Sequence, residues 1–459
     1  MKSIELLPTG KNIIDNIYKD PFHRNKEIMA FLEMLTTIEG HFSISIDGKW
    51  GSGKTFFVKE CELALNVLND ENGLDSEKRS KVLHSLDFSK DDLKKKLKKQ
   101  KCIYFDAWAN DSYDNPIIAI LNTLISSQSL LKQADIKQLT STLEKLTESF
   151  FSNKVGIDLT LLKYAMKPKE VEDFQEQVSL HEYIKKVINN LTRKDQRLNI
   201  FVDELDRCNP RFAVKLLEQI KHYFLLDNVT FIFSTNILEL SKTINKFYGN
   251  DFRGDKYLNR FFDLSLSIPE IDADSYFDYL ISENSLLVYI KNELAIIKFL
   301  NMSLRGINNF IANNRIIDYM KLENNPEIFT QVHKTIYMDI VWSVVPILIG
   351  VRTVNYSSYA ELLSGKNEKL FANALEHTEF WNLLRYDASA SELLSLCNLD
   401  KNNTIEDNKD NIVKTIYDKL FVTTLNRNQV KTKSDNFWYA VNQNLNEVLK
   451  TISSNFHFE

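Results

Sequence analysis

Glycine and proline are scarce in this chain, which has 12 glycines and 8 prolines among 459 residues. Globular proteins on average contain about 7% glycine and about 5% proline, so collagen-like and Gly/Pro-rich low-complexity classes are excluded. A cluster of glycines in such a chain is therefore informative.

Cysteine is scarce as well. The four cysteines are far apart and form no CxxC pair, which argues against a structural zinc site or a disulfide framework. Scattered buried thiols in a reducing cytoplasm are the simpler interpretation. The four residues are Cys61, Cys102, Cys208 and Cys397.

Neither sign of charge dominates, because the formal net charge is −5. Such a balance gives no general attraction to nucleic acid or to anionic membranes. The N-terminus lacks the apolar segment of a secretion signal. The longest apolar run, residues 340–351, is shorter than the ~20 residues of a membrane span and contains Pro346 and Gly350. We expect a buried helix or a bent core segment there, and no membrane span.

Five short apolar segments predict strands, and helical patterns separate them. Alternation of strands and helices is typical of a parallel sheet in an α/β fold. Residues 69–101 are rich in charge and are interpreted as a linker or an exposed helical insertion, and residues 115–190 as a mostly helical, amphipathic insertion. The predicted strands are 41–47, 102–108, 198–202, 229–234 and 264–268.

A glycine cluster follows the first predicted strand and precedes a predicted helix. It fits the phosphate-loop pattern G-x-x-x-x-G-K-[ST] at every fixed position. Backbone N–H groups and the helix N-terminus bind phosphate in such loops, the lysine reaches the β and γ phosphates, and the threonine hydroxyl binds Mg²⁺. The predicted nucleotide-binding residues are Gly48, Lys49, Trp50, Gly51, Ser52, Gly53, Lys54, Thr55 and Phe56.

An acidic pair, Asp203 and Glu204, follows the apolar strand at 198–202. This is the Walker B position, where the aspartate holds Mg²⁺ through water and the glutamate polarises the attacking water. Asp206 and Arg207 come next, and we expect them to form an ion pair that shapes the site. The strand between the two motifs ends at Asp106, which is placed to reach the acidic pair, and at Trp108, which is interpreted as a packing anchor.

With these residues in hand, the chain resembles the KAP family of P-loop NTPases. The resemblance lies in the phosphate loop, in the segment 104–108 and in the segment 202–210, and covers roughly residues 15–270. It implies an α/β, doubly wound parallel sheet of order 5-1-4-3-2, followed by an α-helical lid and a helical C-terminal domain. The implied boundaries are 1–270 for the NTPase core, with a helical insertion at about 109–190, then 271–325 and 326–459.

Several residues gain expected roles from the resemblance and from the related AAA+ ATPases. Asn236, after the fourth strand, resembles a polar sensor. Arg260, just before the fifth strand, resembles an arginine finger, with Arg253 as its rival, and a finger implies a homo-oligomer. Arg305 resembles the sensor of a helical lid. Many family members carry membrane spans between the Walker motifs, and the insertion here has none.

The resemblance implies Mg²⁺-dependent hydrolysis of ATP, since no N-K-x-D motif for guanine is present. We expect a nucleotide-driven switch or assembly ATPase in prokaryotic anti-phage defence, with a protein partner from the same operon. Two alternatives stay open: a nucleotide-gated scaffold with little turnover, and a nucleic-acid remodelling ATPase. The lysine-rich run 94–101 is the feature that suggests nucleic acid; a solvated helix face is its other interpretation.

Overall fold

The computed structural model describes residues 7–69, 74–126, 180–249, 251–281, 288–316, 331–384, 387–400, 404–423 and 430–454. They form two compact units. The sheet unit is Leu7–Glu270, and the helical unit lies within Ile271–Glu459.

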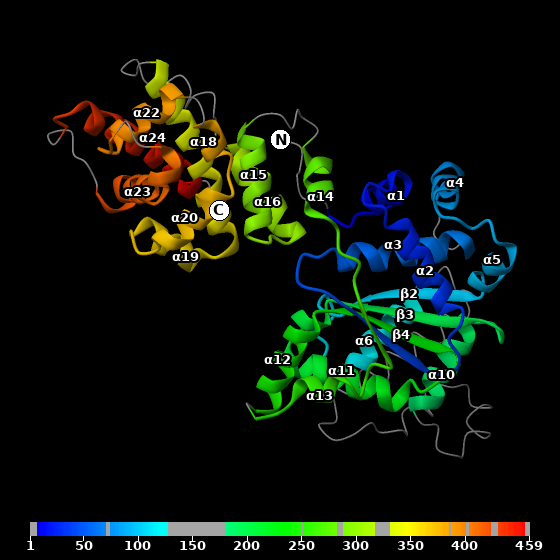
Figure 1. Cartoon of the computed structure of the whole chain (residues 1–459). Coiled ribbons are helices and arrows are strands. Elements are labelled where there is room, and N and C mark those ends of the chain that lie inside the picture. Colours follow the sequence, from blue (N-terminus) through cyan, green and yellow to red (C-terminus); the bar gives the residue numbers. More distant parts are fainter. Residues whose placement is uncertain are drawn as a thin grey trace, which may run out of the picture. The chain divides into compact units, whose positions relative to one another are not determined.

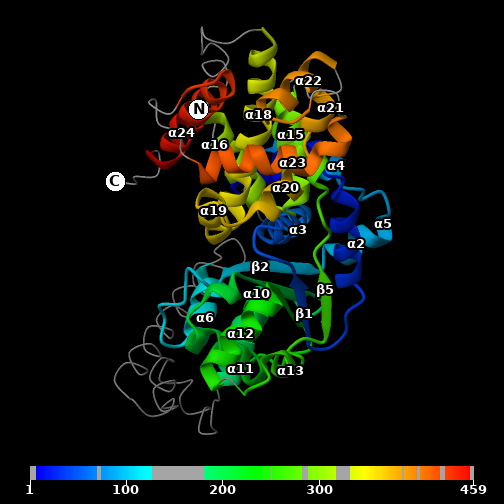
Figure 2. The same ribbon diagram turned by 60° about the vertical axis from the view of Figure 1, so that its left-hand side comes forward.

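The sheet unit is built on five parallel strands in the order β2-β3-β4-β1-β5. This is the predicted order 5-1-4-3-2 read from the opposite edge, and Figure 2 shows β5 beside β1 at that edge. All five predicted strands are confirmed. Their bounds are β1 Phe42–Asp47, β2 Gln100–Asp106, β3 Arg197–Asp203, β4 Val229–Thr235 and β5 Leu264–Ser267.

The apolar run of β3 is explained by burial on both faces. Leu198, Ile200 and Val202 point into one hydrophobic core, and Phe201 points into the other. A strand buried on both sides needs apolar residues at every position rather than at alternate ones.

Helices cover both faces of the sheet, as a doubly wound fold requires (Figure 1). One layer consists of α1 Gly10–Lys19, α2 Asn25–Leu35, α3 Lys54–Asn69, α4 Ser76–Ser85 and α5 Asp91–Leu97. The other consists of α6 Pro116–Ser126, α10 Leu180–Leu191, α11 Pro210–Tyr223, α12 Ile237–Tyr248 and α13 Gly254–Leu258.

Two expectations for the segments between strands need correction. The charged segment 69–101 contributes Val82, Leu93 and Leu97 to the core, so α4 and α5 are part of the helical layer and not an exposed insertion. Helix α6 is buried along most of its length instead of amphipathic, because it packs against α10 and α11 as well as against β2. The rest of the predicted insertion, 127–179, lies outside the described residues.

The described part of the helical unit contains helices and no strand. Helix α18 packs against most of the others, and its near-continuous apolar sequence follows from that position. The bounds are α14 Ala273–Leu280, α15 Val288–Phe299, α16 Leu304–Ile316, α18 Gln331–Val354, α19 Tyr356–Leu363, α20 Glu368–Glu376, α21 Phe380–Leu383, α22 Asp387–Leu396, α23 Ile405–Tyr417, η2 Asp418–Val422 and α24 Lys433–Ser454.

Helix α18 contains the long apolar run and is longer than that run. Its segment Val332–Val354 is the one helix in the described parts of the chain with the length and composition to cross a membrane. Of its most apolar window, 83% is buried inside the unit, as in a core helix. The predicted buried helix is confirmed, with Pro346 inside it. All four cysteines are buried and unpaired, as predicted.

Candidate functional site

The parallel register brings the carboxyl ends of β1, β2, β3 and β4 together at one end of the sheet. Asp106 lies opposite Asp203, Asp203 opposite Ser234, and Asp47 opposite Thr235. In open α/β sheets, ligands bind beyond the carboxyl ends of the strands. The glycine-rich loop, residues 48–55, and the acidic turn, residues 203–207, both begin at this end of the sheet.

The glycine-rich loop connects β1 to α3. Gly51 and Gly53 have φ angles of 77° and 89°, a region that is costly for residues with a Cβ atom. At Gly48 an added Cβ would lie 2.5 Å from Ile268 Cγ2, so glycine is needed there for space. The Ser52 hydroxyl is buried with no hydrogen-bond partner. An unsatisfied donor beside a helix N-terminus fits a phosphate group.

Lys54 is the first residue of α3 and is only 9% exposed. Its ammonium donates to the carbonyl oxygens of Gly48 at 2.6 Å and Lys49 at 3.1 Å. Burial lowers the pKa of Lys54, and Asp206 and the other nearby carboxylates act in the opposite direction. The Lys54 ammonium therefore lies against the carbonyl groups at the start of the loop and close to the carboxylates of the acidic turn.

Asp203 ends β3 and is 1% exposed. One carboxylate oxygen accepts from the Glu204 amide at 3.0 Å, and the other accepts from the Tyr104 hydroxyl at 2.9 Å. Tyr104 belongs to β2 and was not singled out from the sequence, although its place one strand over and two residues before the strand end could have suggested it. Donors on both oxygens suit a carboxylate that holds a hydrated ion.

Glu204 follows directly, in a left-handed backbone conformation with φ of 61°. Its Oε1 accepts from Thr55 Oγ1 at 3.4 Å, and its Oε2 forms an ion pair with Arg207 Nε. Burial raises the pKa of Glu204, neighbouring Asp203 raises it further, and Arg207 lowers it. The glutamate thus links the P-loop to the acidic turn.

Asp206 lies in the 3-10 turn η1, Leu205–Arg207. Its carboxylate accepts from Trp50 Nε1 at 2.5 Å and from Thr235 Oγ1 at 3.2 Å. The expected Asp206–Arg207 ion pair is therefore wrong, because Asp206 is engaged by these two donors and Arg207 pairs with Glu204. Asp206 connects the P-loop to the end of β4.

Asp106 and Trp108 occupy the turn after β2. The Asp106 side chain accepts from the Ala109 amide at 2.9 Å, and so stabilises the turn beside Asp203. Trp108 is 52% exposed, so the prediction that it is a packing anchor is wrong. The Arg207 guanidinium carbon lies 5.5 Å from the centre of its indole ring.

The remaining predicted site residues have other local contacts or belong to the helical unit. Asn236 caps α12 by accepting from the Glu239 amide at 3.3 Å, beside the Ile237 amide that donates to Asp47 at 2.8 Å. Arg253 pairs with Asp255 at 2.7 Å on the surface. Arg305 is exposed in the first turn of α16, in the helical unit.

Arg260 is exposed at the amino end of β5. Asp263, three residues later, donates its amide to the carbonyl of Ser43 at the start of β1. The P-loop follows the other end of β1, about 16 Å away at ~3.3 Å per residue. Arg260 and the P-loop of the same chain therefore lie at opposite ends of the sheet.

Mg²⁺ is usually held by one or two protein oxygens together with phosphate and water. Thr55 and Asp203 provide such oxygens on either side of Glu204. No cluster of three or more His, Cys, Asp or Glu side chains suited to a metal occurs in the described parts of the chain. The residues fit an ion that arrives with a nucleotide rather than one held by the protein alone.

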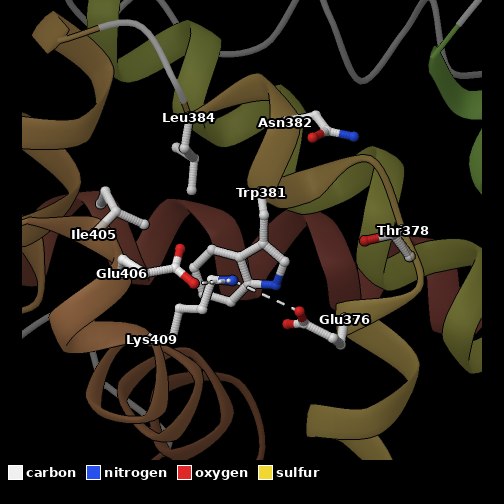
Figure 3. Close-up of a pocket in the computed structure, with 8 residues that line it drawn as sticks. All are labelled: Glu376, Thr378, Trp381, Asn382, Leu384, Ile405, Glu406 and Lys409. Atoms are coloured by element: carbon white, nitrogen blue, oxygen red, sulfur yellow. Dashed lines mark ion pairs between the residues drawn. The ribbon is translucent and has the colours of Figure 1, made fainter.

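A hollow of about 320 Å³ lies in the helical unit (Figure 3). Lys409 crosses it, 3.0 Å from Glu406 and 3.6 Å from Glu376, and its ammonium lies 5.3 Å from the Trp381 ring centre. The cation is thus already paired, and we assign no nucleotide to this hollow.

The lysine-rich run 94–101 is partly neutralised within the sheet unit. Lys96 pairs with Asp92 at 2.9 Å, and Lys99 pairs with Asp195 at 3.4 Å. These contacts favour the solvated helix face over a phosphate-binding surface.

Comparison with known proteins adds one match. The family model described as the KAP family P-loop domain matches residues 24–320, more than half of the chain. The match continues beyond 270 through α14, α15 and α16, so the resemblance extends further than the 15–270 expected from the motifs. No curated protein matches the chain.

Proposed function

The chain belongs to the KAP family of P-loop NTPases, and from this premise we propose that it is a Mg²⁺-dependent nucleoside triphosphatase that uses ATP. The observation that carries the proposal is the contact between Thr55 Oγ1 and Glu204 Oε1 at 3.4 Å. It joins the phosphate loop to the acidic turn, so that one bound triphosphate would touch both.

Each residue of the cluster has a chemical part in this proposal. Loop amides, the Ser52 hydroxyl and the Lys54 ammonium bind phosphate oxygens. Thr55 and Asp203 hold Mg²⁺, which neutralises phosphate charge when it is bound. Glu204 orients a water molecule and accepts its proton. Asn236 lies at the end of β4, where its amide senses the γ-phosphate.

We further propose that the active form is a homo-oligomer in which hydrolysis works as a switch. Arg260 supports this, because it lies at the end of the sheet away from its own P-loop. In this proposal Arg260 acts on the nucleotide of another copy, as arginine fingers do. Arg305 is the proposed nucleotide sensor of the helical unit.

The test is steady-state phosphate release with ATP and Mg²⁺. Lys54→Ala removes the phosphate-binding cation, and Glu204→Gln removes the base while keeping the shape of the side chain. We expect both variants to lose turnover, with ATP binding retained in Glu204→Gln alone. Glu77→Gln, an exposed acid on α4, is the matched control and should behave as wild type. Full turnover in Glu204→Gln would refute the proposed base.

The setting of the switch, anti-phage defence with an effector protein from the same operon, follows from the resemblance alone. A phage-challenge assay comparing wild type with Glu204→Gln tests it, and equal protection by both would instead favour the nucleotide-gated scaffold. Stimulation of turnover by DNA or RNA, weakening steeply with salt, would favour the remodelling alternative.

A further inference from the structure

Arg207 has two contacts that nothing in the proposed function uses. Its Nε pairs with Glu204 Oε2, and its guanidinium lies 5.5 Å from the centre of the Trp108 ring. We propose that Arg207, braced by Trp108, is a positioning residue that aims Glu204 at the attacking water. This inference rests on the proposed role of Glu204 as the base.

The direction of Glu204 follows from how its two oxygens are shared. Arg207 engages Oε2, which leaves Oε1 on the side of Thr55, 3.4 Å away. A glutamate without such a partner samples several rotamers, and ordering it at the moment of reaction costs free energy. Fixing one oxygen in advance therefore favours the reactive geometry.

The backbone conformation of Glu204 also supports a positioning role for Arg207. Its φ of 61° lies in the left-handed region, which non-glycine residues adopt rarely and mainly where the surroundings hold them. The amide of Arg207 donates to the Glu204 carbonyl at 3.1 Å and closes the turn. The Arg207 side chain thus holds the Glu204 carboxylate, and the Arg207 amide holds the Glu204 carbonyl.

Arg207 forms its ion pair with Glu204 and not with Asp206, the other carboxylate of the 3-10 turn region. Asp206 already accepts from Trp50 and Thr235. The Arg207 and Glu204 side chains are 25% and 18% exposed, so their ion pair is better shielded than a surface pair.

Trp108 explains why the cation is an arginine. A planar guanidinium can pair at its edge while its face lies on an indole, which an ammonium group cannot do. Trp108 keeps 52% of its surface exposed and contributes little to the core. We assign to this exposed aromatic side chain the role of supporting the Arg207 guanidinium.

The first experiment separates positioning from folding and binding. In Arg207→Gln we expect kcat to fall about 10–100-fold, the range seen when the partner that orients a metal-binding side chain is removed, with KM and ATP affinity little changed. Arg207→Lys should recover part of kcat. Trp108→Phe should retain more activity than Trp108→Ala. Arg211→Gln, on the exposed first turn of α11, should leave kcat as in wild type.

Chemical rescue gives a readout that a purely structural role would not produce. Millimolar guanidinium added to Arg207→Ala should restore part of kcat, and should do nothing for Glu204→Gln. A rise of kcat in Arg207→Gln would overturn the inference, because Arg207 would then restrain Glu204. A joint loss of kcat, ATP affinity and melting temperature, without rescue, would overturn it as well.

A double-mutant cycle tests the pair even if turnover is absent. The unfolding free energies of Glu204→Gln, Arg207→Gln and the double variant should be non-additive. Additive effects would refute the pairing, whereas absent wild-type turnover or a fully active Glu204→Gln would refute the proposed function instead.

Discussion

Tyr104 supports the acidic turn from a neighbouring strand, because its hydroxyl donates to the carboxylate of Asp203 at 2.9 Å. Lys59 of α3 lies over the Tyr104 ring, 4.7 Å from its centre. The Lys59 ammonium thus contacts one face of the Tyr104 ring, while the Tyr104 hydroxyl orients Asp203. A partner that orients a metal-holding carboxylate matters for function even though it touches neither metal nor substrate.

Tyr104→Phe should therefore weaken the response to Mg²⁺. We expect the Mg²⁺ concentration for half-maximal turnover to rise, or turnover to fall, by roughly 10–100-fold, the usual effect of removing such a partner. Tyr113→Phe, on an exposed loop, is the control. An unchanged Mg²⁺ dependence in Tyr104→Phe would show that Asp203 needs no donor from β2.

Asp339 is a buried carboxyl on the apolar helix α18. It is 2% exposed, and its Oδ2 has no hydrogen-bond partner. Burial raises the pKa of Asp339 from 3.8 to about 7. Because the folded state holds this proton more tightly than the unfolded chain, the stabilisation is complete below the unfolded pKa and is lost as pH rises through about 7.

Asp339→Asn should remove this dependence on pH. The unfolding free energy of the variant minus that of wild type should grow between pH 5 and pH 7, by up to about 1.4 kcal/mol per pH unit. Urea denaturation at several pH values measures it, with the exposed Asp410→Asn as control. A difference that is the same at every pH would contradict the raised pKa.

Helices α15 and α18 approach closely at Gly350. A Cβ atom added there would lie 2.5 Å from Ile296 and 2.9 Å from Leu300, so neighbouring side chains would have to move. Gly306, on α16, is different, because an added Cβ would meet only ordinary contacts of 3.5 Å or more. The two glycines thus form a matched pair within one unit.

Gly350→Ala should destabilise the helical unit and Gly306→Ala should not. Overpacking costs about 1–3 kcal/mol, against a gain of up to about 1 kcal/mol from helix propensity. At Gly306 only the gain applies. Thermal unfolding monitored by circular dichroism should show a lower midpoint for Gly350→Ala alone; equal midpoints would mean that the helices adapt without cost.

The elements of the sheet were predictable because their signals are local. A run such as 198–202 is apolar at each position apart from Asn199, and the loop from Gly48 to Thr55 has fixed chemistry at fixed spacing. The partners of the side chains in the candidate site were not predictable from the sequence. The Glu204–Arg207 pair spans a turn in which Glu204 has a left-handed backbone, and no sequence pattern signals that conformation. Trp108 was misplaced because its apolar character suggests burial, whereas the turn after β2 leaves it half exposed.

For the molecule as a whole, the sheet unit contains the proposed phosphate, metal and base residues, and its proposed arginine finger is Arg260. Arg260 is at the opposite end of β1 and β5. Under the proposal that Arg260 is a finger acting between copies, activity should depend on assembly.

Mixing two inactive variants tests this dependence. Arg260→Ala keeps an intact base, and Glu204→Gln keeps the finger, so each alone should lose roughly 10³-fold or more of its turnover. A mixture should regain turnover at the sites where a Glu204→Gln copy offers Arg260 to an Arg260→Ala copy. A mixture as inactive as its components would argue against a finger in trans, and Arg253→Ala in place of Arg260→Ala tests the rival.

Hydrolysis by this protein is tested most directly by following the fate of one bound ATP. Excess protein is loaded with ATP, Mg²⁺ is added, and the bound nucleotide is identified over time in wild type, Lys54→Ala and Glu204→Gln. We predict ATP hydrolysis at this site: wild type should convert its ATP to ADP and phosphate, Glu204→Gln should keep ATP intact, and Lys54→Ala should bind none. Wild type that holds ATP as long as Glu204→Gln does would contradict it.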